Sequence, residues 1–102
     1  MAIKRTKLLV YVWIEKEMRK AQRDLKRPVL PRELQPRLPF YRAEGSLRRD
    51  MLAMYEMGRL VRVGGYGCRQ GYRLPTRIER LAWSLNAGMW PHGVERIQYV
   101  AA

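Results

Sequence analysis

Apolar residues recur along the first part of the chain at spacings that predict a long helix. Neither Gly nor Pro occurs between Thr6 and Lys26. The apolar residues that can share much of one helical face there are Leu9, Val12, Trp13, Ala21 and Leu25. The stretch LLVYVWI within this segment also fits a strand when it is taken alone. We predict a helix over residues 6–26, ended by Pro28, because proline disfavours helix in the preceding residue and has no N–H.

The middle of the chain predicts two more helices, one weak and one clear. Pro31 suits a first helical turn, but Pro36 limits this element to a short or kinked helix over residues 31–38. The next helical spacing is formed by Leu47, Met51, Met54 and Gly58, with Leu52 and Tyr55 widening the apolar face. This pattern predicts a helix over residues 46–57, with Gly58 as its C-terminal cap.

Alternation replaces helical spacing after this segment. Apolar and basic residues alternate in Val61–Val63, the last three positions of the run that begins at Leu60, and again in Tyr72–Leu74. This pattern predicts an antiparallel hairpin over residues 60–74. Apolar residues at helical spacing follow, namely Ile78, Leu81, Ala82 and Leu85. They predict a helix over residues 76–87 that Gly88 stops, while the stretch 88–102 fits no single element. The fold class is therefore α+β, mostly α, in one domain over residues 1–102.

Charge then indicates the kind of partner. The chain has 21 Lys and Arg against 9 Asp and Glu, which gives a formal net charge of +12. Such a charge is self-repulsive unless a polyanion neutralises it, so nucleic acid is the leading class of partner. Because 47% of the residues are hydrophobic and fall in periodic runs, the chain is expected to fold rather than to stay a disordered basic peptide.

Two stretches carry a family resemblance. Residues 46–51 read Ser-Leu-Arg-Arg-Asp-Met, and residues 58–63 read Gly-Arg-Leu-Val-Arg-Val, followed by Gly64 and Gly65. These stretches resemble the recognition helix and the wing of bacterial winged helix-turn-helix repressors, closest to the DeoR and GntR types. The resemblance covers residues 6–75 in element order and residues 45–65 at the level of motifs. It implies a winged helix-turn-helix fold with a two-stranded wing and a C-terminal helix, and binding of double-stranded DNA.

The outer side of the 46–57 helix supplies the first candidate DNA contacts. The residues that flank its apolar stripe are Ser46, Arg48, Arg49 and Ala53. A helix fits the major groove of B-DNA, where an arginine can read guanine through two hydrogen bonds. The competing interpretation is a solvated helix face on which Arg48 or Arg49 pairs with Asp50 or Glu56.

The predicted hairpin supplies the second set of contacts. Glycines at 64, 65, 67 and 71 permit tight turns and leave room for a close phosphate backbone. The candidate contacts of the hairpin are Arg62, Tyr66, Arg69, Gln70 and Arg73. By the resemblance, the wing lies along the sugar-phosphate backbone or enters the minor groove, with Arg69 as the leading contact at its tip. The alternative is an ordinary flexible hairpin whose arginines only keep it in solution.

The sequence leaves other binding roles open. Three prolines and the stretch PFYRAEG precede Ser46, so the turn before the recognition helix departs from the family pattern. Leu52, Met54 and Tyr55 make that helix more apolar than DNA reading requires, which fits core packing or a protein-binding face. The first alternative is therefore a protein interaction module, for example one that binds a polymerase. An RNA-binding basic protein is less favoured, because the aromatic residues are scattered.

Candidate catalytic residues are few. Cys68 stands next to Arg69, which would favour the thiolate, and His92 is the single histidine. Neither has a partner in sequence that defines a catalytic set or a metal site. We therefore expect no enzymatic activity, no metal and no cofactor.

Compartment and assembly complete the expectations. One cysteine cannot form an internal disulfide, which favours a reducing cytoplasm. The apolar run near the N-terminus lacks the small-residue cleavage site of a signal peptide. A transcriptional regulator of a bacterium, an archaeon or one of their viruses fits these features. A homodimer through the N- and C-terminal helices is also expected, and Trp13, Trp83 and Trp90 offer large apolar contacts. For Trp13 and Trp83, the favoured role is instead the core of the monomer.

Overall fold

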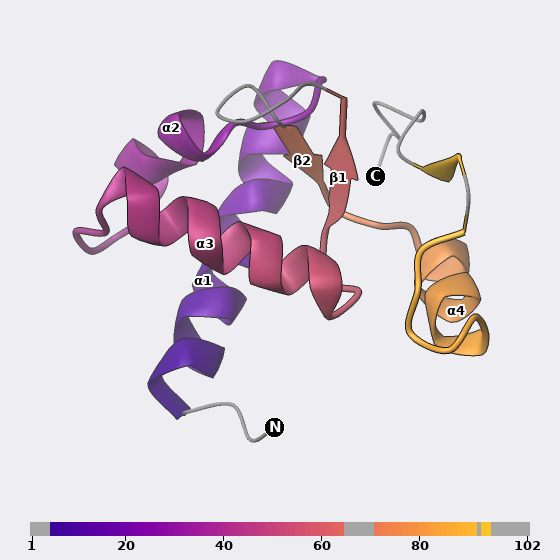
Figure 1. Cartoon of the computed structure of the whole chain (residues 1–102). Coiled ribbons are helices and arrows are strands. Elements are labelled where there is room, and N and C mark those ends of the chain that lie inside the picture. The colour runs from indigo at the N-terminus through magenta and orange to yellow at the C-terminus, as the bar shows by residue number, and fades with distance from the viewer. Residues whose placement is uncertain (1–4, 65–70, 92, 95–102) are drawn as a thin grey trace.

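The fold is mostly helical, with one two-stranded antiparallel sheet (Figure 1). The computed structural model describes residues 5–64, 71–91, 93 and 94. Its elements are α1 (Arg5–Leu25), α2 (Pro31–Leu34), a 3-10 turn (Gln35–Arg37), α3 (Glu44–Glu56), β1 (Val61–Val63), β2 (Gly71–Arg73) and α4 (Arg77–Leu85). Each segment that the sequence predicted to be helical contains a helix, and the predicted hairpin is present, with ends shifted by a few residues.

α1 buries a different face from the one that its first apolar residues suggested. Its core-facing apolar side chains are Tyr11, Ile14, Met18 and Ala21. Leu9 and Val12, which the sequence placed on the same face as Ala21, are exposed instead. The run LLVYVWI is apolar around most of the helix, so it does not define which side faces inward. The charged residues that follow it set the phase, because they must remain near water.

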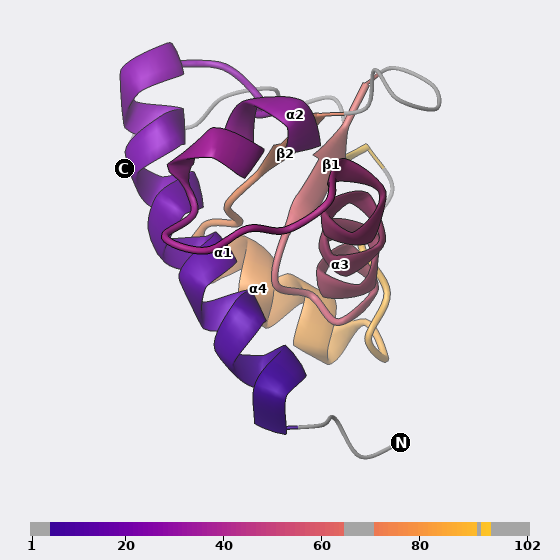
Figure 2. The same cartoon turned by 90° about the vertical axis from the view of Figure 1, so that its left-hand side faces the viewer.

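The core lies between α1 on one side and α3 on the other, with the hairpin between them (Figure 2). The short helix α2 contributes Leu34, and Leu38 follows from the turn after it. α3 contributes three fully buried side chains at helical spacing, Leu47, Met51 and Met54. This packing fixes which face of α3 remains outside.

The sheet is small but is joined to the start of α2. Its register pairs Val61 with Arg73 and Val63 with Gly71. At the other edge of β2, Val29 and Tyr72 exchange two backbone hydrogen bonds, of 2.8 and 2.9 Å. The hairpin is therefore held at its base by the segment that connects α1 to α2.

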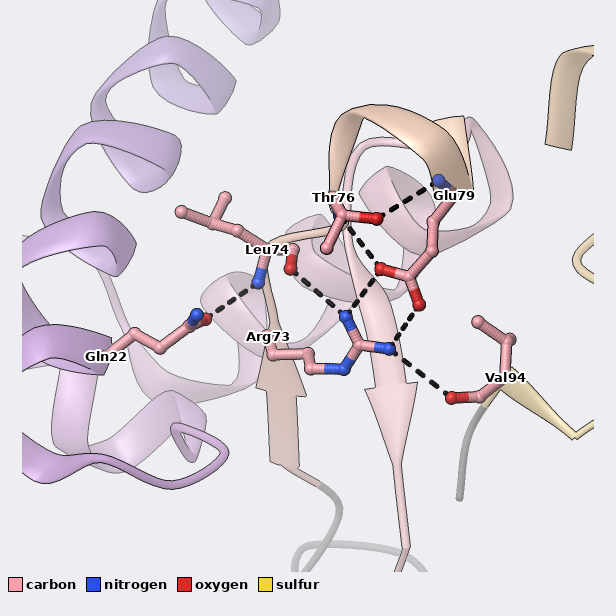
Figure 3. Close-up of polar contacts among 6 residues, drawn as sticks. All are labelled: Gln22, Arg73, Leu74, Thr76, Glu79 and Val94. Atoms are coloured by element: carbon pink, nitrogen blue, oxygen red, sulfur yellow. Dashed lines mark hydrogen bonds and ion pairs between the residues drawn. The ribbon is translucent and has the colours of Figure 1, made fainter. Parts of the chain in front are cut away.

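The buried guanidinium of Arg73 connects β2 to α4. This side chain is 0% exposed and donates to both carboxylate oxygens of Glu79, at 2.8 and 2.6 Å (Figure 3). It also donates to the backbone oxygens of Leu74 and Val94. Glu79 in turn closes a capping box with Thr76 at the start of α4. The bidentate pair therefore fixes the first turn of α4 against the sheet.

α4 also rests on the end of α3, where a glycine makes room for a tryptophan. Gly58 has a φ of +77°, and a Cβ there would lie 2.5 Å from the ring of Trp83. Trp90 stacks on Tyr55 and donates its indole N–H to the backbone oxygen of Tyr55 at 2.9 Å. Gly58 thus caps α3, as predicted, and also permits the close approach of α4.

The ion pair of Arg73 with Glu79 predicts a pH-dependent contribution to stability. Hydrogen bonds from Arg73 hold the pKa of Glu79 below its ordinary value near 4.5. A lowered pKa in the folded state stabilises the fold above the unfolded pKa, and this contribution is lost as the pH falls through the folded pKa. We expect Glu79→Gln to cost about 3 kcal/mol near pH 7, because Arg73 then lacks its buried counter-charge.

Urea unfolding at about pH 7 and about pH 3 measures this effect. The difference in unfolding free energy between wild type and Glu79→Gln should narrow at the lower pH, because this pH lies below the ordinary pKa of Glu79 and the unfolded wild type then binds a proton. Glu33→Gln is the matched control, because its partner Arg27 is half exposed and the pair should contribute less than about 1 kcal/mol. A gap of equal size at both pH values would contradict the assignment.

Candidate nucleic-acid interface

The outer face of α3 carries an arginine without an acidic partner. With Leu47, Met51 and Met54 turned into the core, the exposed positions of this helix are Gly45, Arg49, Leu52 and Glu56. Within the part of the chain that the structure describes, Arg49 forms no ion pair. Its guanidinium is therefore available to a ligand that approaches this face.

A buried carboxylate holds α3 in this orientation. Asp50 is 1% exposed and accepts hydrogen bonds from Arg42 Nε at 2.8 Å, Arg42 Nη2 at 3.1 Å and Lys7 Nζ at 3.0 Å. These partners come from the loop before α3 and from the first turn of α1. The hydrogen bonds from Arg42 to Asp50 raise the pKa of Arg42. Asp50 therefore fixes the rotation of α3 about its axis. Arg49, the residue before it, is turned outward.

Arg48 lies on the flank of α3 that faces the hairpin. Its Nη2 atom is 3.2 Å from Glu44 Oε2, one helical turn earlier, and both side chains are more than one-third exposed. The sequence had left open a pairing of Arg48 with Asp50 or Glu56, but its partner is Glu44. An exposed pair of this kind contributes little to stability, so Arg48 can exchange Glu44 for another anion at low cost.

Arg62 of β1 lies on the same flank. Its guanidinium stands 5.8 Å from the ring centre of Tyr55, and its side chain is half-buried. Burial raises the pKa of Tyr72, and the charges of Arg62 and Arg48 oppose that rise. Both arginines thus lie within electrostatic range of Tyr72, on the side where α3 meets the hairpin.

The remaining predicted contacts have three different outcomes. Ser46 is half-buried on the opposite flank of α3. Tyr66, Arg69 and Gln70 lie outside the described residues. The prediction for Arg73 is wrong: its side chain is fully buried and pairs with Glu79, so it stabilises the attachment of α4 and is not accessible to DNA.

Sequence reasoning missed the two partners of Asp50. Arg42 is eight positions away and Lys7 is 43 positions away, so neither stands at a helical spacing that would indicate the pair. The signal that sequence did offer was an acid among apolar residues on a helix, which requires a cationic partner if it is buried.

Comparisons with known proteins identify no family for this chain, and the described residues contain no further site of the kinds considered next. The chain gives no significant match to protein-family models, to curated proteins or to solved structures. Among the described residues, no group of three or more His, Cys, Asp or Glu side chains is arranged to hold a metal ion. Over the same residues, no helix combines the length and the apolar character needed to cross a membrane.

The role of Asp50 predicts a stability difference between two matched variants. Asp50→Asn should destabilise the fold by about 1–3 kcal/mol, because it removes the charge that satisfies Arg42 and Lys7. Glu44→Gln makes the equivalent change at an exposed pair on the same helix and should cost less than about 0.5 kcal/mol. Urea unfolding of the three proteins measures both values. Equal losses in the two variants would show that Asp50 does not anchor α3.

Proposed function

We propose that the chain is a double-stranded DNA-binding protein of the winged helix-turn-helix class, acting as a small transcriptional regulator. The observation that carries this proposal is the outer face of α3, where Arg49 is exposed and has no acidic partner among the described residues, while Asp50 holds the helix in place. A helix of this kind fits the major groove, and an arginine on it can donate two hydrogen bonds to guanine.

The hairpin supports the same proposal through charge. Arg62 and Arg48 both lie within electrostatic range of Tyr72, near the meeting of α3 and the hairpin, so a duplex seated on α3 would bring its phosphates toward both. Such contacts fix the position of the protein on the duplex but carry little sequence information. Occupancy of a site would then block or recruit a polymerase in a microbial or viral setting.

The two rival functions receive less support. Met54 lies in the core, and Tyr55 is half-buried against Trp90, so these two apolar residues of α3 are used in packing. Leu52 alone among the large apolar residues of α3 reaches the surface, which is little for a protein-binding face. RNA recognition on a sheet requires exposed aromatic rings, whereas Tyr72 of β2 is buried.

Variants of α3 and of the hairpin test DNA binding separately. Arg49→Ala should weaken binding to preferred duplexes by about tenfold and reduce discrimination among sequences. Arg62→Ala should weaken binding to all duplexes alike. It should also reduce the magnitude of the slope of log affinity against log salt concentration by about 1. Fluorescence anisotropy with a selected duplex and a random-sequence pool, at low and moderate salt, measures both effects.

Arg32→Ala is the matched control for this experiment. Arg32 is exposed on α2 and forms no ion pair within the described part of the chain. Its loss removes one positive charge away from the proposed interface. If Arg49→Ala and Arg62→Ala bind as Arg32→Ala does, DNA binding through α3 and the hairpin is refuted.

We further propose that two copies associate through α4. Three apolar residues of this helix point away from the rest of the molecule: Ile78 is 80%, Leu81 60% and Leu85 79% exposed. Their spacing places these three residues on one side of the helix, and such a stripe is self-complementary across a two-fold axis. Met89, which follows the end of α4, is 66% exposed. A dimer of this kind would bind two half-sites, in agreement with the expected homodimer.

The charge of the chain gives this association a distinctive salt dependence. Each copy carries +12, so screening by salt should strengthen an apolar contact between copies, whereas salt weakens DNA binding. Leu81→Glu should abolish the dimer in sedimentation equilibrium, and Ser84→Glu, which adds the same charge at another exposed position of α4, should retain most of it. A wild-type chain that stays monomeric at high salt and high concentration would exclude this contact.

A further inference from the structure

The exposed side chains of α1 are mostly basic over its second half. Its exposed cations at spacings of three and four residues are Lys16, Arg19, Lys20 and Arg23. At a rise of about 1.5 Å per residue, they extend over roughly 10 Å along one side of the helix. Of the carboxylates in this segment, Glu17 is buried, and the exposed Asp24 pairs with Arg37 at 2.9 Å. We call these four cations the α1 stripe.

The α1 stripe is also largely unneutralised. In residues 5–64, 71–91, 93 and 94, the carboxylates other than Glu56 all form ion pairs. Only one of them reaches the α1 stripe, through a 3.6 Å contact between Lys20 and Glu17. Lys16 lies over the ring of Trp13 at 4.8 Å. The stripe therefore presents a concentrated positive field to solvent.

A groove beside the α1 stripe continues this charge. It has a volume of about 770 Å³ and lies between α1, the end of α3 and α4. The basic residues that line it are Lys16, Arg19, Arg59 and Arg80, and Glu15 is the single carboxylate among its described lining residues. Glu15 is already engaged, since it pairs with Arg59 and lies 3.6 Å from Arg80. The groove is thus positive after its internal ion pairs are counted.

Figure 2 shows α1, which carries the α1 stripe, and α3 on opposite sides of the core. The outward face of each helix points away from that core, although the groove beside the α1 stripe reaches Met57 and Gly58 after the end of α3. The molecule measures about 35 by 33 by 25 Å. A duplex on α3 therefore leaves the α1 side uncovered.

We propose that the α1 stripe and its groove bind the phosphate backbone of a second DNA duplex, so that one chain bridges two duplex segments. The first of these duplexes rests on the proposed function of α3. The second would be held by phosphate contacts that release condensed counterions and carry no base recognition. The groove, with its basic lining, would receive one strand of that backbone, and the α1 stripe would follow it.

Energy transfer between a donor-labelled and an acceptor-labelled duplex tests bridging, and anisotropy of one labelled duplex measures single binding. The informative variant is Arg19→Glu/Arg23→Glu, since both positions are exposed and outside the core. Its matched control is Arg32→Glu/Arg77→Glu, which makes the same change in charge at exposed positions that belong neither to the α1 stripe nor to the lining given for its groove. Circular dichroism checks that all variants retain their helices.

The wild type and the control should bring the two duplexes together at similar protein concentrations. The α1 variant should require at least about tenfold more protein for transfer, while its single-duplex affinity stays within about threefold of the control. Equal transfer by the α1 variant and the control would overturn the proposal, as would a wild type that binds DNA without transfer. Transfer that is lost in Leu81→Glu but kept in the α1 variant would also overturn it, because bridging would then come from two copies.

Failure of this inference is distinguishable from failure of the proposed function. If Arg49→Glu loses single-duplex binding, while the α1 variant keeps both single-duplex binding and energy transfer, α3 binds DNA and the second site does not exist. If the α1 variant loses single-duplex binding and Arg49→Glu keeps it, α3 is not the DNA-binding face and the two-duplex proposal fails with it. The proposal requires both variants to lose transfer, and Arg49→Glu alone to lose single-duplex binding.

Discussion

The buried guanidinium of Arg73 is the constraint on which the arrangement of the other elements depends. It belongs to a strand of three residues, which by itself would be marginal in water. Its bidentate pair with Glu79 joins that strand to α4, and the backbone N–H of Leu74 donates to Gln22 of α1 at 2.8 Å (Figure 3). A charged group without access to water must keep these partners, because leaving it unpaired would cost several kcal/mol. The hairpin, α1 and α4 are therefore positioned together.

The few carboxylates of this basic chain serve mainly as internal anchors. Asp50 fixes the rotation of α3, Glu79 fixes α4, and Glu15 connects the end of α3 to α4 through Arg59 and Arg80. Each of these acids neutralises arginines that hold the fold together. The excess of positive charge is consequently left on outward side chains, above all on the α1 stripe, while the outer face of α3 carries Arg49 together with Glu56. This division explains how a chain of +12 can be folded and still present a basic surface.

The sequence predicted the elements better than it predicted their orientation. Helical spacing and glycine caps located α3 and α4 because both signals are local. Which side of α1 is buried depends on partners distant in sequence, and the run LLVYVWI is apolar on most sides. Alternation along β2 placed Arg73 on the solvent side, but α4 covers that side and supplies Glu79. The pairing of Asp50 with Arg42 and Lys7 is likewise tertiary. Local patterns thus identified Arg49 and Arg62 as surface cations, and they failed where a residue's environment is made by another element.

α4 has its polar contacts inside and its apolar stripe outside, the reverse of an ordinary surface helix. Glu79 and its capping box, together with Trp83 over Gly58, fix this rotation, so the helix cannot turn to bury Ile78 and Leu85. Covering the stripe with a second copy removes apolar surface from water, and repulsion between the two chains opposes it. DNA bound to α3 would neutralise part of that repulsion. By linkage, association through α4 and binding of DNA must then strengthen each other. The orientation that leaves α4 exposed is thus the feature that would make occupancy of paired half-sites cooperative.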